Sequence, residues 1–133
     1  MNNVEIVKGL YQSFTSGDVP TVLAGMTADI EWREAEGNPY KMDGEPFVGP
    51  QSILQDLFTK LGEDWEAFTV TPKAFHDAGD TVVVEVRYTG TNNRTGLKLD
   101  AQACHVWKIE DGKAKSFQQY ADTAQLQRVM GQP

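Results

Sequence analysis

Apolar residues at the start of the chain recur with the spacing of one helix face. This spacing predicts an amphipathic helix over residues 3–16. The stretch "SGD" interrupts the pattern, and Asp18 followed by Pro20 predicts the capped start of a short second helix. The apolar positions of the first helix are Val4, Val7, Leu10, Tyr11 and Phe14.

A strand, a long loop and a further helix follow. Ile30, Trp32 and Glu34 alternate with two charged residues, which predicts a strand in "DIEWRE". Residues 36–50 are rich in Gly, Pro and Asn and are predicted to form a loop, and long loops in compact domains often act as lids or binding segments. The helix predicted to begin at Pro50 has its apolar face on Ile53, Leu54, Leu57, Phe58 and Leu61.

From about Phe68 onward the pattern has the period of two that is typical of strands. Four such runs, "TVTPKAFHD", "TVVVEVRYTG", "LKLDAQACHVWKI" and "KAKSFQQYA", are separated by the turn sequences "DAGD", "NNRTG" and "EDGK". A short helix, "DTAQLQRVM", ends at Gly131. No linker or repeat divides the sequence, so residues 1–133 are predicted to form one α+β domain with helices on one face of an antiparallel sheet.

The last hairpin determines which polar side chains face inward. A two-residue type I′ turn in "EDGK" pairs Glu110 with Lys113. Counting back from this pair places His105 opposite Gln118, and side chains opposite each other share one face of the sheet. The polar residues predicted to converge on this face are His105, Gln118, Tyr120 and Asp122.

The preceding hairpin, counted separately, predicts the same face. With Asn92 and Asn93 at its centre, Tyr88 pairs with Leu97, and a run of valines and leucines extends the face up to His105. A slip of one residue in either turn would reverse the assignment. A histidine that faces an apolar interior loses its hydration, so it bonds to a neighbouring polar group or to a ligand in a cavity.

Aromatic side chains would form the walls of such a cavity. Apolar walls with a few convergent polar groups are typical of a pocket for a small hydrophobic molecule. The aromatic residues expected to line it are Tyr11, Trp32, Phe58, Trp107 and Tyr120.

Charge and composition narrow the partners. The formal net charge of -7 argues against nucleic acid or an anionic membrane, because both would repel such a surface. No stretch has the length of a membrane span and no signal-peptide pattern opens the sequence, so a cytoplasmic protein is expected. Cys104 is the single cysteine and the two histidines lie on different predicted elements, so neither an internal disulfide nor a metal site is predicted.

Three stretches together resemble the NTF2-like superfamily, and within it the SnoaL-like and ketosteroid-isomerase-like proteins. They are "LYQSFTSGDVPTVLAGMTADIEW", "FVGPQSILQDLF" and "HVWKIEDGKAKSFQQYADTAQL". The resemblance implies a cone-shaped, cystatin-like fold, in which a strongly curved and mostly antiparallel sheet wraps around three helices and encloses a pocket. It also implies a homodimer that packs through the outer sheet face.

The resemblance also implies site roles. His105 is similar to a pocket histidine of the SnoaL-like cyclases, and Asp122 resembles their acid/base aspartate. Glu34 falls near the general-base carboxylate of the isomerases. Their oxyanion-binding tyrosine has Tyr11 as its nearest candidate, but Leu10 occupies the aligned position, which argues against true ketosteroid isomerase activity.

Each of these residues also has a purely structural interpretation. His105 could bond to a backbone carbonyl or to Gln118 at the edge of the core. Asp122 stands where a helix begins, so it could cap free backbone N–H groups instead of reaching a ligand. Glu34 could be the solvated end of its strand.

Two functions from different classes remain open at this point. The first is acid/base catalysis without a cofactor, by His105 and Asp122 with help from Glu34, of the isomerase, cyclase, dehydratase or epoxide hydrolase type. The second is a non-catalytic protein that holds a small hydrophobic molecule in the same pocket. A protein-interaction adaptor is the less favoured third possibility and predicts an occluded pocket.

Overall fold

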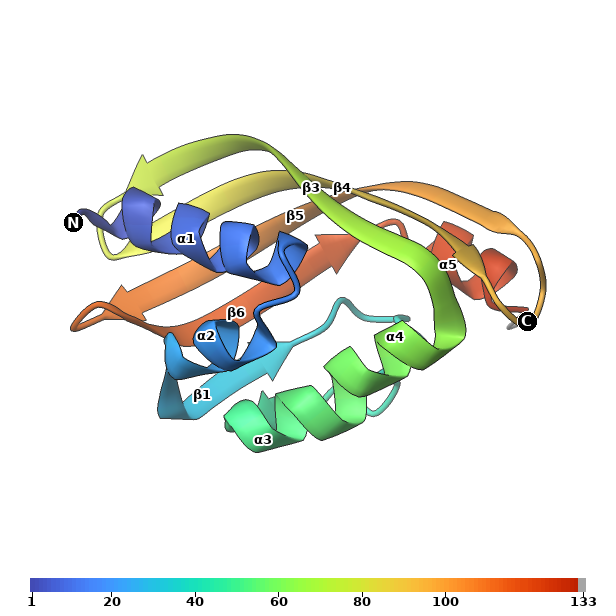
Figure 1. Cartoon of the computed structure of the whole chain (residues 1–133), viewed down its shortest axis with the longest axis horizontal. Helices are drawn as coiled ribbons and strands as arrows, with labels where there is room; N and C mark the ends of the chain where they lie inside the picture. Colours follow the sequence, from blue (N-terminus) through green and yellow to red (C-terminus); the bar gives the residue numbers. More distant parts are fainter. Residues whose placement is uncertain (132–133) are drawn as a thin grey trace.

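The computed structural model describes residues 1–131, and its main element is one curved six-stranded sheet. The strands are β1 (Met26–Arg33), β2 (Phe47–Val48), β3 (Trp65–Ala78), β4 (Thr81–Asn92), β5 (Lys98–Glu110) and β6 (Lys113–Ala121). Their order across the sheet is β2-β1-β6-β5-β4-β3, and the β1–β6 pair is parallel while all other pairs are antiparallel. The mostly antiparallel α+β sheet predicted from the sequence is therefore confirmed (Figure 1).

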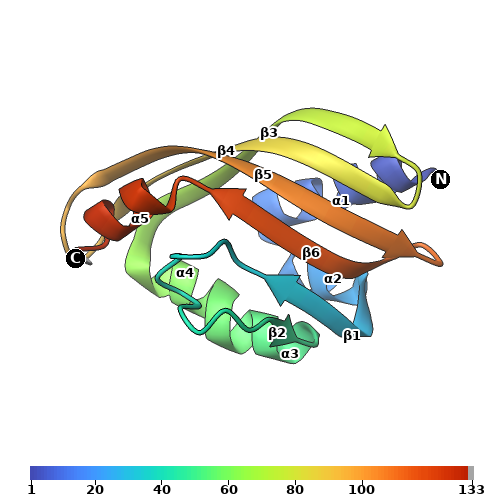
Figure 2. The ribbon, with the colours of Figure 1, turned by 180° about the vertical axis from the view of Figure 1, so that it is seen from behind.

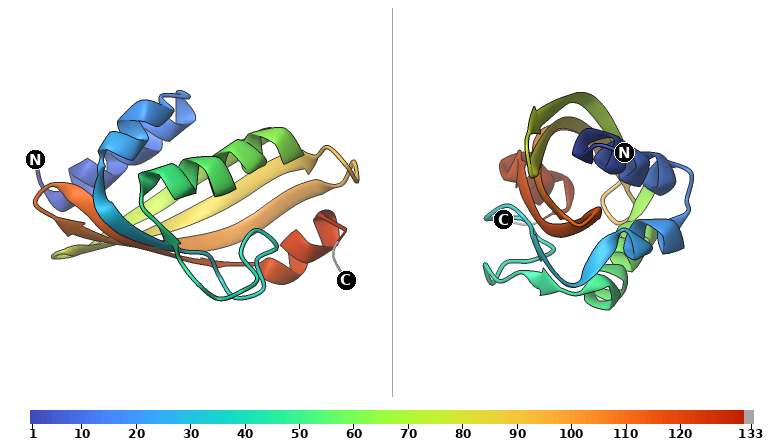
Figure 3. Two further views of the ribbon diagram at one scale, coloured as in Figure 1. Left: turned by 90° about the horizontal axis from the view of Figure 1, so that it is seen from below. Right: turned by 90° about the vertical axis from the view of Figure 1, so that its left-hand side faces the viewer.

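Helices cover the concave side of this sheet. The helices are α1 (Asn3–Thr15), α2 (Val19–Ala24), α3 (Pro50–Ile53), α4 (Thr59–Asp64) and α5 (Thr123–Val129), and the π-helical turn η1 (Leu54–Phe58) joins α3 to α4. Figure 3 shows that the sheet bends around α1, α2 and the continuous α3–α4 segment, as the expected cone requires. Seen from behind, β1 lies beside β6, and α5 continues from the end of β6 (Figure 2).

Local sequence explains where these helices begin. Asn2 caps α1 by accepting the N–H of Glu5 at 2.8 Å, and Asp18 caps α2 by accepting the N–H of Thr21 at 3.3 Å. Pro20 and Pro50 stand in the first turns of α2 and α3, where a missing N–H carries no penalty. No helix of residues 1–131 combines the length and the apolar character needed to cross a membrane.

The turn between β5 and β6 has the predicted form, but the pairing beyond it is shifted. Asp111 and Gly112 both have positive φ, of 50° and 78°, as a type I′ turn requires. A β-bulge then follows, because Ile109 pairs with Ala114 while the next pair joins Lys108 to Ser116.

The bulge corrects the predicted inward set of this hairpin. His105 lies opposite Gln119 rather than Gln118, and Phe117 and Gln119 are the buried residues of β6. Gln118 and Tyr120 point to the opposite face, where Tyr120 is 59% exposed. The prediction that these two residues face the pocket with His105 is therefore wrong, because one extra residue in a strand reverses every side chain after it.

The β4–β5 hairpin shows the opposite outcome, a wrong register with the right face. Tyr88 pairs with Ala101 and not with Leu97, because the turn is centred on Arg94 and Thr95 and the loop is longer than predicted. The pairing moves by an even number of residues, so the buried face still runs along β4 and β5 to His105. Leu97, expected inside, is exposed.

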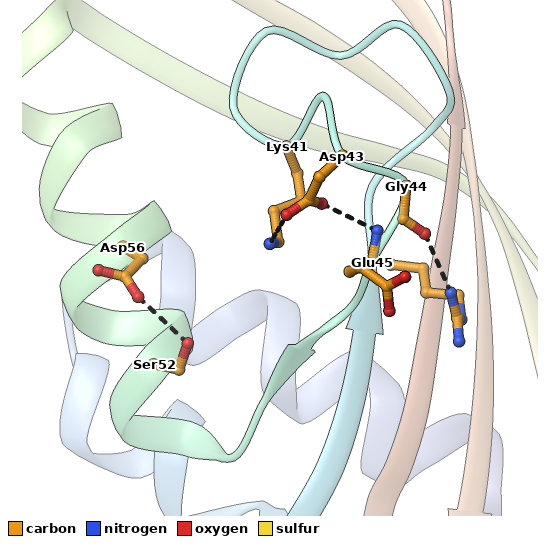
Figure 4. A network of polar contacts seen from close by, with 7 residues as sticks. Lys41, Asp43, Gly44, Glu45, Ser52 and Asp56 are labelled. Atoms are coloured by element: carbon orange, nitrogen blue, oxygen red, sulfur yellow. Dashed lines mark hydrogen bonds and ion pairs between the residues drawn. The ribbon is translucent and has the colours of Figure 1, made fainter.

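Asp43 organises the tip of the long loop between β1 and α3. Lys41 Nζ donates to Asp43 Oδ2 at 2.7 Å, and the backbone N–H of Glu45 donates to Oδ1 at 2.9 Å (Figure 4). The carbonyl of Gly44 accepts a bond from Arg33 Nη1 at 3.4 Å, and Ser52 bonds to Asp56 at 3.3 Å in the helix that follows. The loop is thus tied to β1 near the end that carries Glu34.

Candidate functional site

An aromatic cavity lies between the helices and the concave face of the sheet. The cavity has a volume of about 80 Å³. Trp32 stacks on Phe117 with ring centroids 3.7 Å apart and meets Phe58 edge-on at 5.6 Å. The aromatic residues that line the cavity are Tyr11, Phe14, Trp32, Tyr40, Phe58, Trp65, Phe68, Tyr88, Trp107 and Phe117.

His105 lies between two tyrosines in the wall of this cavity. The hydroxyl of Tyr11, from α1, is 2.6 Å from His105 Nδ1, and the hydroxyl of Tyr88, from β4, bonds to His105 Nε2. The indole N–H of Trp107 donates to the Tyr11 hydroxyl at 2.9 Å. His105 is only 4% exposed, so both ring nitrogens have protein partners in place of water.

Gln119 and Asn38 extend this network to the end of β1. Gln119 Nε2 donates to the Tyr88 hydroxyl at 2.9 Å, while its Oε1 accepts from the backbone N–H of Ala35 at 3.2 Å and from Asn38 Nδ2 at 2.8 Å. Asn38 Oδ1 in turn accepts the backbone N–H of Tyr40 at 2.9 Å. The two backbone N–H groups fix the orientation of both amides, because a backbone N–H can only donate.

Burial makes His105 hard to protonate. Loss of hydration lowers its pKa from 6.5 to about 3. Burial likewise raises the pKa of both Tyr11 and Tyr88 well above the usual value of a phenol. At neutral pH the histidine and both phenols are therefore uncharged, and the three side chains exchange hydrogen bonds without carrying a net charge.

Glu34 is the carboxyl of the cavity. It follows directly after β1, and burial raises its pKa from 4.5 to about 7. The nearby indole N–H of Trp32 lowers this pKa slightly, yet within residues 1–131 neither Trp32 Nε1 nor Glu34 Oε2 has a partner at hydrogen-bonding geometry. A buried carboxyl oxygen without a partner is uncommon, and it marks a place where a ligand can bind.

Glu34 also borders a second space on the outer side of the sheet. The groove there is also lined by Arg33, Lys41, Gln118 and Tyr120. Gln118 and Tyr120, which were wrongly predicted to line the cavity, thus line this outer groove together with Glu34. Glu34 therefore lines both the aromatic cavity and the outer groove.

Asp122 does not lie among the residues of the cavity. It is the N-cap of α5, where Oδ1 accepts the backbone N–H of Gln125 at 3.1 Å and Oδ2 accepts Gln125 Nε2 at 3.1 Å. The structure thus brings Glu34 and His105 to one cavity and places Asp122 outside it. The position of Asp122 supports its structural interpretation as a helix cap.

Replacing Asp122 should affect stability and leave the cavity unchanged. We expect Asp122→Ala to lower the free energy of unfolding by about 1 kcal/mol, the usual worth of a helix cap, as measured by urea denaturation. Asp122→Asn is the matched control, because asparagine caps equally well, and it should unfold like the wild type. Loss of ligand binding or turnover in a stable Asp122→Asn variant would instead restore a direct role for this carboxylate.

Sequence reasoning missed several residues of the site, among them Phe117, Gln119, Tyr88 and Asn38. Phe117 and Gln119 were missed because no local sequence pattern predicts the β-bulge that turns them inward. Tyr88 was placed on the inward face, but nothing indicated that it pairs with the imidazole. Asn38 lies in the loop, where backbone geometry alone decides its direction. In residues 1–131, no three His, Cys, Asp or Glu side chains gather where they could hold a metal ion.

Comparison with known proteins gives a consistent set of relatives. The model of the SnoaL-like domain matches residues 7–117. An NTF2-like protein from Burkholderia thailandensis E264 is 34% identical, with a TM-score of 0.92 over 100% of this chain and 99% of that one. An NTF2-like protein of unknown function from Burkholderia pseudomallei K96243 is 27% identical, with a TM-score of 0.87 over 98% of each chain.

A third structure carries a ligand. TerC, co-crystallised with polyporic acid, is 25% identical, with a TM-score of 0.84 over 97% of this chain and 98% of that one. No curated protein matches this sequence.

Proposed function

The chain belongs to the SnoaL-like domain family of NTF2-like proteins, and from this membership and the geometry of its cavity we propose that it binds a small, largely apolar molecule and transfers a proton on it. The proton would leave a carbon next to a carbonyl group and be taken up by Glu34. The electron pair of the broken C–H bond would move to the carbonyl oxygen as an enolate. Return of the proton to another carbon would complete an isomerisation. Attack of the enolate carbon on a second carbonyl carbon of the same molecule, followed by return of the proton to the resulting alkoxide, would complete a cyclisation.

The observation that carries this proposal is the state of Glu34. A general base works best when its pKa lies near the working pH, and burial raises the pKa of Glu34 to about 7. Its Oε2 has no hydrogen-bond partner among residues 1–131, so a ligand can approach it without breaking an existing bond. Glu34 also lines the outer groove, through which the carboxyl would exchange its proton with solvent.

The wall around His105 supplies the second requirement of this chemistry. An enolate forms readily only when hydrogen-bond donors meet the oxygen on which charge develops. Tyr11 and Tyr88 line the same cavity as Glu34, and their O–H groups could donate to the enolate oxygen. His105 itself has both nitrogens bonded to phenols, so we assign proton abstraction to Glu34 and hydrogen bonding to the tyrosines.

The aromatic walls favour a flat ligand. Planar rings stack well on Trp32, Phe58 and Trp107, and the cavity has few polar atoms to hydrate a charged or sugar-like molecule. The co-crystallisation of TerC with polyporic acid supports an organic molecule as the ligand. We therefore propose aromatic or polyketide-like carbonyl compounds as the ligand class.

Filling the cavity should block binding. Val70, on β3, lines it, and we expect Val70→Phe to weaken binding of 1-indanone or 2-tetralone by about tenfold or more, which corresponds to about 1.4 kcal/mol. All three tryptophans of the chain line the cavity, so quenching of their fluorescence measures the binding.

The matched control places the same substitution elsewhere. Val83 alternates with the buried Val82 and Val84 on β4, so Val83→Phe adds its ring on the opposite face of the sheet and should bind both ketones like the wild type. Equal binding by the two variants would contradict a ligand site in the aromatic cavity.

A further inference from the structure

The contacts around His105 hold more protons than they can use. A neutral imidazole carries one N–H, and each of the two phenols carries one O–H. These three protons serve only two contacts, one between Tyr11 and Nδ1 and one between Tyr88 and Nε2. One phenol O–H is therefore left over.

Neither phenol can use the extra proton inside the protein. The Tyr11 oxygen accepts the indole N–H of Trp107, and the Tyr88 oxygen accepts the amide N–H of Gln119. Both of these partners are donors and cannot accept a proton. Within residues 1–131 the two hydroxyls have no other hydrogen-bond partner, and both line the aromatic cavity.

We infer that Tyr11, His105 and Tyr88 act as one unit that presents a single free phenol O–H to the cavity, where it donates to an acceptor oxygen of the ligand. His105 determines which phenol holds this proton. When the imidazole proton is on Nδ1, it donates to Tyr11, Tyr88 donates to Nε2, and the Tyr11 O–H is free. When the proton is on Nε2, the roles reverse and the Tyr88 O–H is free.

The inference deepens the proposed function, on which it rests, by specifying the ligand. Its oxygen at this end must accept a hydrogen bond, as a carbonyl or an enolate oxygen does. A hydrocarbon of the same shape would leave the phenol proton without a partner in an apolar cavity, which is unfavourable. His105 is thus a positioning residue that acts through the two tyrosines.

Glu34 biases the choice between the two arrangements. Burial is the main cause that raises the pKa of Tyr88, and the negative charge of Glu34, which lines the same cavity, raises it further. An ionised Glu34 attracts the phenol proton of Tyr88 and so favours the imidazole proton on Nε2. Phe117, which meets the imidazole edge-on with ring centroids 4.7 Å apart, is uncharged.

The position of the imidazole proton can be read directly by ¹⁵N NMR of the histidine ring in the full chain. The chain has two histidines, so His76→Gln leaves His105 as the only signal, and His76 is an exposed residue paired with Glu85. We expect one protonated and one bare nitrogen in the ligand-free protein at neutral pH. Two protonated nitrogens would overturn the inference.

Two single variants should move this proton in opposite directions. In Tyr88→Phe, Nε2 loses its hydrogen-bond partner. A buried N–H without a partner costs more free energy than a buried nitrogen lone pair without one, so the imidazole proton should shift to Nδ1. Tyr11→Phe should shift it to Nε2 for the same reason. A histidine that only fills space would show the same distribution in both variants, and that result would refute the unit.

Ligand preference tests the free O–H. We expect the wild type to bind 1-indanone up to about tenfold more tightly than indane, its counterpart without oxygen, because one hydrogen bond contributes about 1 kcal/mol. The Tyr11→Phe/Tyr88→Phe double variant should lose this preference. Tyr40→Phe is the matched control, since Tyr40 also lines the cavity but already donates its O–H to Asp64 at 2.8 Å, and it should keep the preference.

The outcomes separate this inference from the proposed function. If the double variant keeps the preference, or if neither probe binds the wild type, the ligand contact is refuted. If the ketone preference and the opposite proton shifts are found but Glu34 has no influence on proton transfer, the unit stands and the catalytic proposal fails.

Discussion

Glu34→Gln should lower the rate of proton abstraction by about 10²–10⁴-fold, the usual contribution of a positioned general base. Glutamine has the size of glutamate and can fill the same space, but its amide cannot take up a proton. The measurement is hydrogen–deuterium exchange at the carbon next to the carbonyl of 1-indanone or 2-tetralone in D₂O, followed by NMR. This assay requires no knowledge of the natural substrate.

The pH dependence of the same reaction follows from the pKa of Glu34, which is about 7. Only the ionised carboxylate can act as a base. The exchange rate of the wild type should therefore rise with pH through about 7 and level off above it, while Glu34→Gln should show no such rise. A rate that falls with pH would indicate a general acid as the essential group.

Two comparisons test whether slower exchange in Glu34→Gln has a cause other than loss of the base. Asp122→Asn, which changes the other predicted carboxylate, should exchange like the wild type because Asp122 caps α5 outside the cavity. Ketone binding by Glu34→Gln, measured by tryptophan fluorescence, should remain within a few-fold of the wild type. If the variant loses binding in parallel with exchange, Glu34 acts in ligand binding and its assignment as the base fails. If the wild type exchanges none of the ketones that it binds, the chain is a ligand-binding protein without catalysis.

Much of the fold could be predicted because its signals are local. Helix spacing and caps located α1, α2 and α3, and Asp111 with Gly112 fixed the turn between β5 and β6. The concave face of β4 and β5 was also predicted correctly, since an even error in register leaves each side chain on its own face. For β4 and β5, periodicity was therefore sufficient to identify the buried side.

The site was harder to predict because a single inserted residue changed it. The bulge near Lys108 exchanged Gln118 and Tyr120 for Phe117 and Gln119, and a bulge leaves no pattern that one sequence can reveal. The environment of His105 depends on tyrosines from α1 and β4, which meet only in the folded chain. The hydrogen bonds and the pKa of His105 thus depend on residues distant in sequence, whereas its burial could be predicted from the alternation of residues along its own strand.

His105 should also make the protein less stable in acid. Burial lowers its pKa in the folded state to about 3, while the unfolded chain binds the proton at the ordinary pKa of 6.5. Between these two values the unfolded state holds one more proton than the folded state. The contribution of His105 to stability is therefore complete above pH 6.5 and falls by about 1.4 kcal/mol per pH unit as the pH drops toward 3.

The measurement is the free energy of unfolding in urea as a function of pH, compared between the wild type and His105→Gln. Between about pH 6 and 4 the wild type should lose about 3 kcal/mol more than this variant, which has no proton to gain. His76→Gln is the control and should follow the wild type, because His76 is exposed.

Glu34 acts in the opposite direction, and the comparison of the two histidine variants separates its effect. Its pKa in the folded state is about 7, so the folded state holds the extra proton and stability falls as the pH rises from 4.5 to 7. This contribution is present in the wild type and in both variants and cancels when they are subtracted. Equal slopes for the wild type and His105→Gln would mean that His105 takes up its proton at the same pH in the folded and the unfolded chain, and would contradict the buried, doubly bonded imidazole on which the tyrosine–histidine unit depends.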